Sequence, residues 1–438
     1  MMTNYAQLAF RHLLEKCLVD DEPGKVFLPA TPGDDSIWGE MARTLAETLN
    51  CVTLTDGEAF LDELTSAIRD TGVSRCVVIP PWESRQTMSD DLKKRYPRLD
   101  FPQIVWQRAA AVMPSDGQLS ICVPTNLLSS ESGRGFRTSL FDQHPPLLVA
   151  TLADACPQIN NRLHMAFRFG LVTVKTNAVQ PESLRFFKAT AVNDADQLNS
   201  IKCDFDRICR VQGGSTEFGY VVRDGLPPGS PLIHDLYSPS FLKEQKSLEV
   251  IGEMKRIDEL FDFVPSLHTT HAARQLFESN AEGRSVVIDG RNIRQDGTID
   301  VDQIGRWAAD VGDRALHAGD LCFRGIGHFG KGEVVFAQVL ACQLPAVASQ
   351  SVVVLRRSKS VDSSDMDVLV AMLRSQRFAE SIAARSDGGL HLLRGWFGEM
   401  QIPVPEAGLK LAVSNLNDAI GHFEHWKQQA IRSRSVLF

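Results

Sequence analysis

The chain has 438 residues, of which 43% are hydrophobic and 23% charged, and its formal net charge at pH 7 is −8. This length predicts two or three globular domains, each large enough to bury its own core. The negative charge excludes a protein that coats nucleic acid through bulk charge, although it leaves room for a local basic groove.

Cysteine and hydropathy patterns favour a cytoplasmic protein. The 9 cysteines form no CxxC pair and no Cys/His cluster with zinc spacing. Five of them fall in apolar runs, where a free thiol packs as a small hydrophobe: Cys51, Cys76, Cys122, Cys322 and Cys342. We therefore expect reduced structural thiols and no metal site. We also expect no signal peptide and no membrane helix, because no apolar run reaches transmembrane length.

Strands and helices alternate over residues 1–180. Short apolar runs predict strands at 25–28, 51–54, 76–79, 118–124, 147–152 and 166–174. Amphipathic or alanine-rich stretches predict helices at 5–18, up to about 49, and at 58–70, 101–113 and 136–141. This alternation predicts an α/β domain with a doubly wound, Rossmann-like parallel sheet.

The composition changes after about residue 180. Residues 181–245 contain few long apolar runs and several turn signals, which predicts a connecting segment packed on the first domain. Residues 246–438 predict an α+β domain with a long C-terminal helix. Its expected strands are 285–288, 321–323, 333–340 and 352–355, and its expected helices are 363–384 and 406–434.

A Pro-Pro-aromatic turn, Ile79-Pro80-Pro81-Trp82, directly follows the expected strand at 76–79. Two further blocks follow it, Trp106 to Pro124 and Asn126 to Arg137. The order and spacing of the three blocks resemble the catalytic domain of adenine-N6 DNA methyltransferases, as found in type I modification subunits and type IIG enzymes. The resemblance covers residues 5–180 and implies the doubly wound fold.

The resemblance implies roles for the turn residues. The Pro80 carbonyl would accept a hydrogen bond from the target amino group, and Trp82, after Pro81, would stack on the extruded base. The family places Asn or Asp where this chain has Ile79. A buried amino group that loses one acceptor costs about 1–3 kcal/mol, so this substitution predicts weak or absent methyl transfer.

The cofactor loop also departs from the family pattern. Pro29 and Ala30 match, but Leu28 replaces the leading acid and Pro32 replaces a glycine that lets the backbone approach S-adenosylmethionine. Asp56 would hold the ribose hydroxyls, or else it caps a helix. We therefore expect an inactive methyltransferase-like domain without a cofactor. The alternative is an active S-adenosylmethionine-dependent adenine-N6 methyltransferase with divergent motifs.

Residues 246–438 resemble one target-recognition domain of a type I specificity subunit, followed by its spacer or dimerisation helix. The blocks that carry this resemblance are 288–293, 296–299, 316–325 and 400–405. Such domains read base edges in the major groove while Lys and Arg hold phosphates. The residues that would contact DNA are Arg291, Arg324, His328, Lys331, Arg356, Arg357 and Lys359. A solvated strand end at 356–359 and an ordinary loop residue at His328 remain the alternatives.

Together these features predict a DNA-recognition component of a bacterial restriction-modification or antiphage defence system. The expected partners are double-stranded DNA and a nuclease, translocase or modification subunit. One recognition domain reads a half-site, so we expect a homodimer or a larger complex. A third reading is an assembly scaffold that binds no DNA.

Overall fold

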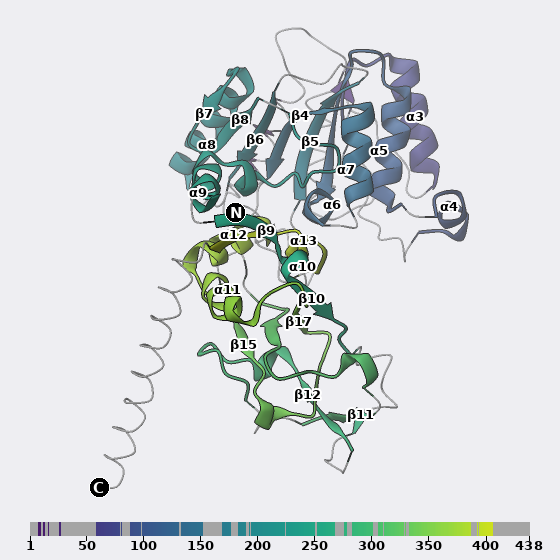
Figure 1. Cartoon of the computed structure of the whole chain (residues 1–438). Helices are drawn as coiled ribbons and strands as arrows, with labels where there is room; N and C mark the ends of the chain where they lie inside the picture. Colours follow the sequence, from purple (N-terminus) through teal and green to yellow (C-terminus); the bar gives the residue numbers. More distant parts are fainter. Residues whose placement is uncertain are drawn as a thin grey trace. The chain divides into compact units, whose positions relative to one another are not determined.

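The structure is a computed structural model of the 438-residue chain. It describes residues 8–9, 12–13, 16, 26–27, 58–78, 80, 88–97, 99–130, 133–151, 169–176, 183–189, 192, 194–223, 225–249, 252–267, 276–277, 283–300, 305–309, 311–327, 329, 333–386, 392 and 394–405. The expected strand at 51–54, the helix that ends near 49 and the helix at 406–434 lie outside these residues. The chain divides into two compact units, Met1–Pro239 and Ser240–Phe438 (Figure 1).

Unit 1 is built on an eight-stranded sheet with the order β1-β2-β3-β5-β4-β6-β8-β7. Its strands are β1 (Val26–Phe27), β2 (Arg75–Val78), β3 (Gln118–Pro124), β4 (Pro146–Thr151), β5 (Phe169–Lys175), β6 (Leu184–Lys188), β7 (Gly214–Ser215) and β8 (Gly219–Val222). β1, β2 and β3 are parallel neighbours, in agreement with the sequence prediction.

The sheet is mixed rather than wholly parallel. β5 lies between β3 and β4 and is antiparallel to both, while β6 and β8 also pair antiparallel. A parallel pair needs a crossover of a dozen or more residues, usually a helix. The sequence shows no helical pattern between the strands expected at 147–152 and 166–174, so a parallel return was the wrong expectation there.

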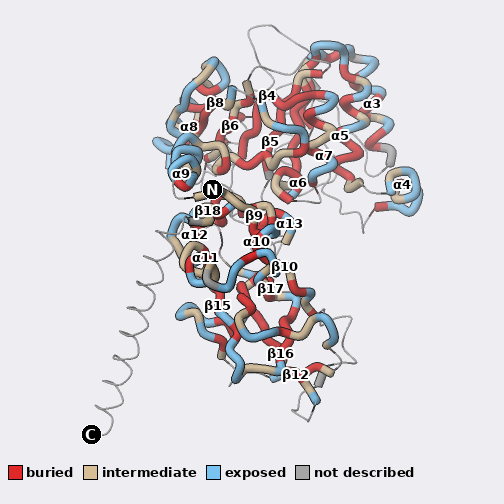
Figure 2. The backbone as a smooth tube through the Cα atoms, in the orientation of Figure 1, coloured by how far each residue is buried: buried red, intermediate tan, exposed pale blue. Residues whose placement is uncertain are grey.

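Helices cover both faces of the unit 1 sheet. The helices are α3 (Glu58–Thr71), α4 (Asp90–Arg95), α5 (Phe101–Val112), α6 (Thr125–Ser129), α7 (Arg134–Gln143), α8 (Ala195–Arg210) and the 3-10 turn η2 (His234–Tyr237). One hydrophobic core joins α3, α5, α6 and α7 to the strands. Figure 2 shows the central strands, β4 and β5 among them, as almost continuously buried, as expected for a sheet covered on both faces, whereas the edge strand β7 is exposed.

Two adjacent phenylalanines of β6 show that α8 lies on the opposite face. Phe186 belongs to the core formed with α3 and α5. Phe187 contacts Phe205 of α8, with ring centroids 4.9 Å apart. Successive side chains of a strand point to opposite faces, so α8 covers the second face. Most of the segment predicted as a connection, 181–245, therefore belongs to unit 1, and unit 2 begins at Ser240.

Unit 2 contains two four-stranded sheets with the orders β10-β17-β14-β15 and β11-β13-β12-β16, and a two-stranded sheet of β18 and β9. Its strands are β9 (Gly252–Arg256), β10 (Phe261–Val264), β11 (Leu276–Phe277), β12 (Ser285–Ile288), β13 (Trp307–Ala308), β14 (Leu321–Arg324), β15 (Phe336–Gln338), β16 (Ala346–Ala348), β17 (Val352–Arg357) and β18 (Gln401–Pro405). Its α-helices are α9 (Pro239–Glu249), α10 (Ile257–Leu260), α11 (Met366–Leu373), α12 (Gln376–Ser386) and α13 (Arg394–Gly398). Its 3-10 turns are η4 (Gly290–Asn292), η5 (Gly312–Arg314), η7 (Ala341–Gln343) and η8 (Ser363–Asp365).

The helix expected at 363–384 is two helices, α11 and α12. The Ser375 hydroxyl accepts a hydrogen bond from the backbone N–H of Phe378 at 3.2 Å. A serine in this position caps the start of a new helix, because its oxygen satisfies an N–H that has no partner within the helix. Helical periodicity continues across the break, which explains why the sequence pattern did not reveal it.

The cysteines follow the expectation in part. Cys76, Cys122 and Cys322 are buried free thiols, and burial raises the pKa of the Cys322 thiol. Cys342, which was expected to pack in an apolar run, is exposed in η7.

Candidate functional site

The methyltransferase-like blocks of unit 1 pack against one another. β2, which precedes the Pro-Pro turn, pairs with β3 in parallel, with Val77 opposite Ser120. Trp106 of α5 is fully buried and makes edge contacts with Phe136 of α7 and His144, at centroid distances of 6.1 Å and 6.0 Å. Burial lowers the pKa of His144. The strand that precedes the Pro-Pro turn and the other two blocks therefore form one continuous part of the core.

Arg137 holds the turn between α6 and α7. Its side chain is buried, and its guanidinium donates to the carbonyls of Leu127, Ser130 and Gly229 at 3.0, 2.7 and 3.1 Å. The α6 carbonyls lack partners within their own helix, so this charge completes the helix end. Arg137 thus has a structural role at the end of the third block.

β1 and β2, which precede the expected cofactor loop and the Pro-Pro turn, end at the same edge of the sheet. β1, β2 and β3 are parallel, so the chain leaves each of them at the same side, where ligands of open α/β sheets bind. Pro80 follows β2 and is buried. The remaining residues of the two expected sites lie outside the described residues: Pro29, Ala30, Asp56, Ile79, Pro81 and Trp82.

A separate group of half-buried polar side chains lies in unit 1 around η2. Lys188 Nζ lies 2.6 Å from Asp235 Oδ2, and His234 Nδ1 lies 2.9 Å from Asp235 Oδ1. Burial alone would raise the pKa of Asp235, but the His234 and Lys188 contacts outweigh it and lower the pKa to about 2. Burial is also the main reason that the pKa of Tyr220, whose hydroxyl donates to the His234 carbonyl, is raised. These contacts fasten η2 to β6.

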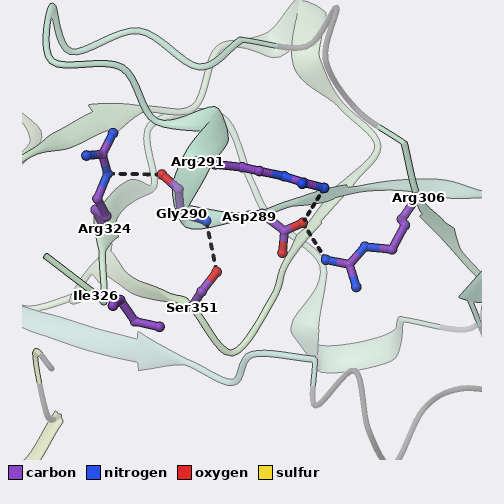
Figure 3. Close-up of a pocket in the computed structure, with 7 residues that line it drawn as sticks. All are labelled: Asp289, Gly290, Arg291, Arg306, Arg324, Ile326 and Ser351. Atoms are coloured by element: carbon purple, nitrogen blue, oxygen red, sulfur yellow. Dashed lines mark hydrogen bonds and ion pairs between the residues drawn. The ribbon is translucent and has the colours of Figure 1, made fainter. Parts of the chain in front are cut away.

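An open pocket of about 610 Å³ lies in unit 2 (Figure 3). It is lined by Asp289, Gly290, Arg291, Arg306, Arg324, Ile326 and Ser351. These residues come from the ends of β12 and β14, from η4, and from the residues that precede β13 and β17. With three arginines and one aspartate, the lining carries a net charge of +2.

Asp289 is shared between two of the arginines. Arg306 Nη2 donates a short hydrogen bond to Asp289 Oδ2, and Arg291 Nη2 lies 3.6 Å from the same oxygen. Figure 3 shows the two guanidinium groups converging on this carboxylate. The Asp289 side chain is 12% exposed, so the carboxylate forms the floor and the arginines form the rim of the pocket.

Arg324 turns its guanidinium toward the backbone of η4. Its Nε donates to the Gly290 carbonyl at 3.1 Å, and its Nη2 donates to the Ile293 carbonyl. Within the part of the chain that the structure describes, Arg324 has no carboxylate partner. This arginine therefore braces the turn that carries Arg291.

Two glycines allow the pocket floor to close. A Cβ on Gly325 would lie 2.9 Å from the carbonyl oxygen of Ser351, and a Cβ on Gly290 would lie 3.0 Å from the same atom. The backbone N–H of Gly325 donates to that carbonyl at 2.7 Å, and the N–H of Gly290 donates to the Ser351 hydroxyl at 2.9 Å. Gly325 needs a residue without a side chain, because the backbones approach too closely for a Cβ, and a Cβ at Gly290 would make a tight contact.

The turn Gly319-Asp320-Leu321, in the block 316–325 of unit 2, has a structural explanation. Gly319 has a φ of +94°, which favours glycine. Asp320 is 2% exposed and accepts from the backbone N–H of His317 and from the guanidinium of Arg356. The hydrogen bond from Arg356 to Asp320 is the main reason that the pKa of Arg356 is raised. Arg356, predicted as a DNA contact, is thus engaged inside the domain.

The other predicted contacts are scattered. Arg357 is exposed and donates to the Val361 carbonyl, and Lys359 is exposed. His328 and Lys331 lie outside the described residues. Of the seven predicted contacts, the pocket therefore brings together Arg291 and Arg324.

Sequence reasoning missed Arg306, Ile326 and Ser351. Arg306 precedes a two-residue strand and belongs to no motif block, so it had no recognisable signal. Ile326 falls directly after the block 316–325 and is 47% exposed, which is unusual for a large apolar side chain. Ser351 stands between the apolar runs of β16 and β17, which marks a turn but not a site.

No group of three metal-binding side chains occurs among the described residues. Within the same residues, no helix is long and apolar enough to cross a membrane.

No family model matches the sequence, and no curated protein matches it. The chain is similar to the cryo-electron microscopy structure of a DrdV–DNA complex (9% identity, TM-score 0.47, 90% of this chain and 56% of that one). It is also similar to the type IIG restriction endonuclease BpuSI (10% identity, TM-score 0.40, 94% and 60%). A third similar structure is the HsdS subunit from Thermoanaerobacter tengcongensis (13% identity, TM-score 0.29, 43% and 45%). This chain spans roughly half of each of these structures.

Proposed function

We propose that this chain is a sequence-specific DNA-recognition component of a bacterial restriction-modification or antiphage defence system, without methyl-transfer activity of its own. The observation that carries the proposal is the arginine-lined pocket of unit 2. Two of the motif blocks that resemble a target-recognition domain, 288–293 and 316–325, both contribute to its lining. A shared surface built from separate motif blocks is what a binding site requires.

The charge distribution supports DNA as the ligand. The pocket lining is net positive in a chain whose net charge is −8, so the positive charge is local. Phosphate contacts by Lys and Arg supply most of the affinity in non-specific DNA binding. A local positive surface on an acidic protein confines that attraction to one place.

The expected partners follow from the presence of a single target-recognition-like domain. One recognition domain reads a half-site, so a second copy of the chain or a larger complex would complete the site. A nuclease, a translocase or a modification subunit would supply the chemistry that this chain lacks.

Three departures in sequence support the loss of methyl transfer. Ile79 stands in place of the family's Asn or Asp, Leu28 in place of an acid and Pro32 in place of a glycine. The first removes an acceptor for the target amino group, and the other two alter the loop that would hold the methionine part of S-adenosylmethionine. Departures in both the target-base site and the cofactor loop are consistent with a domain retained for its fold and not for methyl transfer.

Fluorescence anisotropy with the full chain and a labelled pool of random duplexes tests the DNA-binding part. We expect binding that weakens steeply between about 50 and 200 mM salt, and enrichment of one sequence on repeated selection. Absence of binding at low salt would favour the scaffold reading instead.

Calorimetry with S-adenosylmethionine tests the inactive part. We expect no heat of binding and no labelled methyl group on plasmid DNA after incubation. Micromolar binding would contradict the absence of a cofactor, and methyl transfer would establish the alternative, an active adenine-N6 methyltransferase.

A further inference from the structure

Asp289 holds its two arginines unequally. Arg306 donates a short hydrogen bond to Oδ2, and its side chain is 35% exposed. Arg291 lies 3.6 Å from the same oxygen, beyond hydrogen-bonding distance, and its side chain is 69% exposed. An exposed ion pair with this geometry contributes little to stability. Arg306 is therefore fixed in the pocket, and Arg291 is able to turn toward a ligand.

The form of the site favours a phosphate over a base. Base edges lie at the bottom of a major groove about 8.5 Å deep, so their readers must project from the protein surface. The arginines here line a hollow of about 610 Å³. A phosphate on the outer rim of the duplex projects and can enter such a hollow.

We propose that Arg291 and Arg306 together hold one phosphate group of the DNA backbone, with Asp289 keeping Arg306 in place and releasing Arg291. The inference rests on the proposed DNA-binding function and assigns the site a specific ligand group. Arg324, which lines the same pocket, positions η4 through the carbonyls of Gly290 and Ile293 and does not contact the phosphate.

The charges and donors match this ligand. Two guanidinium groups and one carboxylate leave one positive charge, and a phosphodiester carries one negative charge. A guanidinium has five N–H donors in a planar fork, and the Asp289 contact occupies one donor of Arg306. Enough donors remain for both charged oxygens of the phosphate.

The salt dependence of DNA binding tests the pair. The full-length chain and its variants Arg291→Gln, Arg306→Gln and the double variant are titrated with the random duplex pool between about 50 and 200 mM salt. Each single variant should lower the magnitude of the slope of log K against log salt by about 0.9, the contribution of one phosphate. Arg377→Gln, an equal charge change at an exposed position of α12, is the control and should leave the slope unchanged.

The double variant gives the decisive comparison. Because both arginines hold the same phosphate, it should lose about 0.9 in slope, as each single variant does. Between about 50 and 200 mM salt, the affinity of the double variant should then fall by a factor about threefold smaller than that of the wild type. A loss of about 1.8 would mean two separate phosphates and would overturn the shared site.

Three further outcomes would contradict the inference. Unchanged slopes in variants that still bind duplex would overturn the phosphate pair and leave the proposed function intact. Weakening confined to one DNA sequence would do the same, because it indicates a base contact. Failure of the wild type to bind any duplex would overturn both. Arg291→Gln keeps the test valid if Arg306→Gln proves unstable, because the Arg291 side chain is exposed.

Discussion

The guanidinium group of Arg356 donates two hydrogen bonds to the carboxylate of Asp320, from Nε to Oδ1 at 2.9 Å and from Nη2 to Oδ2 at 2.7 Å. The Asp320 side chain is 3% exposed, whereas that of Arg356 is 26% exposed. Such a bidentate pair fixes the geometry of both partners. It joins β17 to the turn before β14, two segments that are distant in sequence.

Replacement of Arg356 by alanine should destabilise unit 2 strongly. It leaves a buried carboxylate without its charged partner, and loss of one member of a buried pair costs roughly 3–5 kcal/mol. Since Arg356 is partly exposed, we expect about 2–4 kcal/mol from urea unfolding. Lys359→Ala is the control, because Lys359 is exposed and its removal should leave the unfolding midpoint unchanged. A stable Arg356→Ala protein with weakened DNA binding would instead make Arg356 a DNA contact.

Substitution of Gly325 by alanine should also lower stability. The new methyl group would lie 2.9 Å from the Ser351 carbonyl oxygen, a backbone atom that cannot move aside cheaply. Overpacking of this kind costs about 1–3 kcal/mol, which thermal unfolding would detect. Gly305→Ala is the matched control in the same unit, since no atom of the described residues lies within 4 Å of its added Cβ. Equal melting temperatures for the two variants would contradict the close approach.

Much of the unit 1 sheet was predictable because its strands are buried on both faces. β2 and β3 appear in sequence as short apolar runs, and the structure places each within one residue of the expected bounds. The direction of each strand was harder to predict from the sequence, because it depends on which strands pair with it. β5 is an apolar run like the others, and its sequence does not show that it pairs antiparallel with both β3 and β4.

The recognition-like site was predictable as a region and not as a set of contacts. Two of the four motif blocks, 288–293 and 316–325, contribute residues to the pocket lining, whereas 296–299 and 400–405 do not. Which arginine is exposed could not be read from sequence, because Arg324 is engaged by the carbonyls of Gly290 and Ile293. Arg306 became visible as a candidate only through Asp289, 17 positions earlier.

Acid should weaken unit 1 through Asp235. Its folded-state pKa of about 2 lies below its ordinary value of 3.8, so its contribution is present above about pH 4 and is lost as the pH falls toward 2. Because the side chain is 35% exposed, we discount the full linkage value to about 1–2 kcal/mol. Urea unfolding of wild type and Asp235→Asn should differ by this amount at pH 5 and converge near pH 2. Asp62→Asn, at a carboxylate that is 80% exposed, serves as the control and should follow the wild type.

Replacement of Arg324 by alanine should separate bracing from DNA contact. The variant loses the hydrogen bonds to the carbonyls of Gly290 and Ile293, both buried residues, and hydrogen bonds from a charged group contribute about 1.5–3 kcal/mol each. We therefore expect the urea midpoint to fall by an amount that corresponds to at least about 1.5 kcal/mol. Arg291→Ala, at an exposed arginine of the same pocket, should change stability by less than about 0.5 kcal/mol. If Arg324→Ala unfolds like the wild type and weakens only DNA binding, Arg324 contacts DNA and η4 needs no brace.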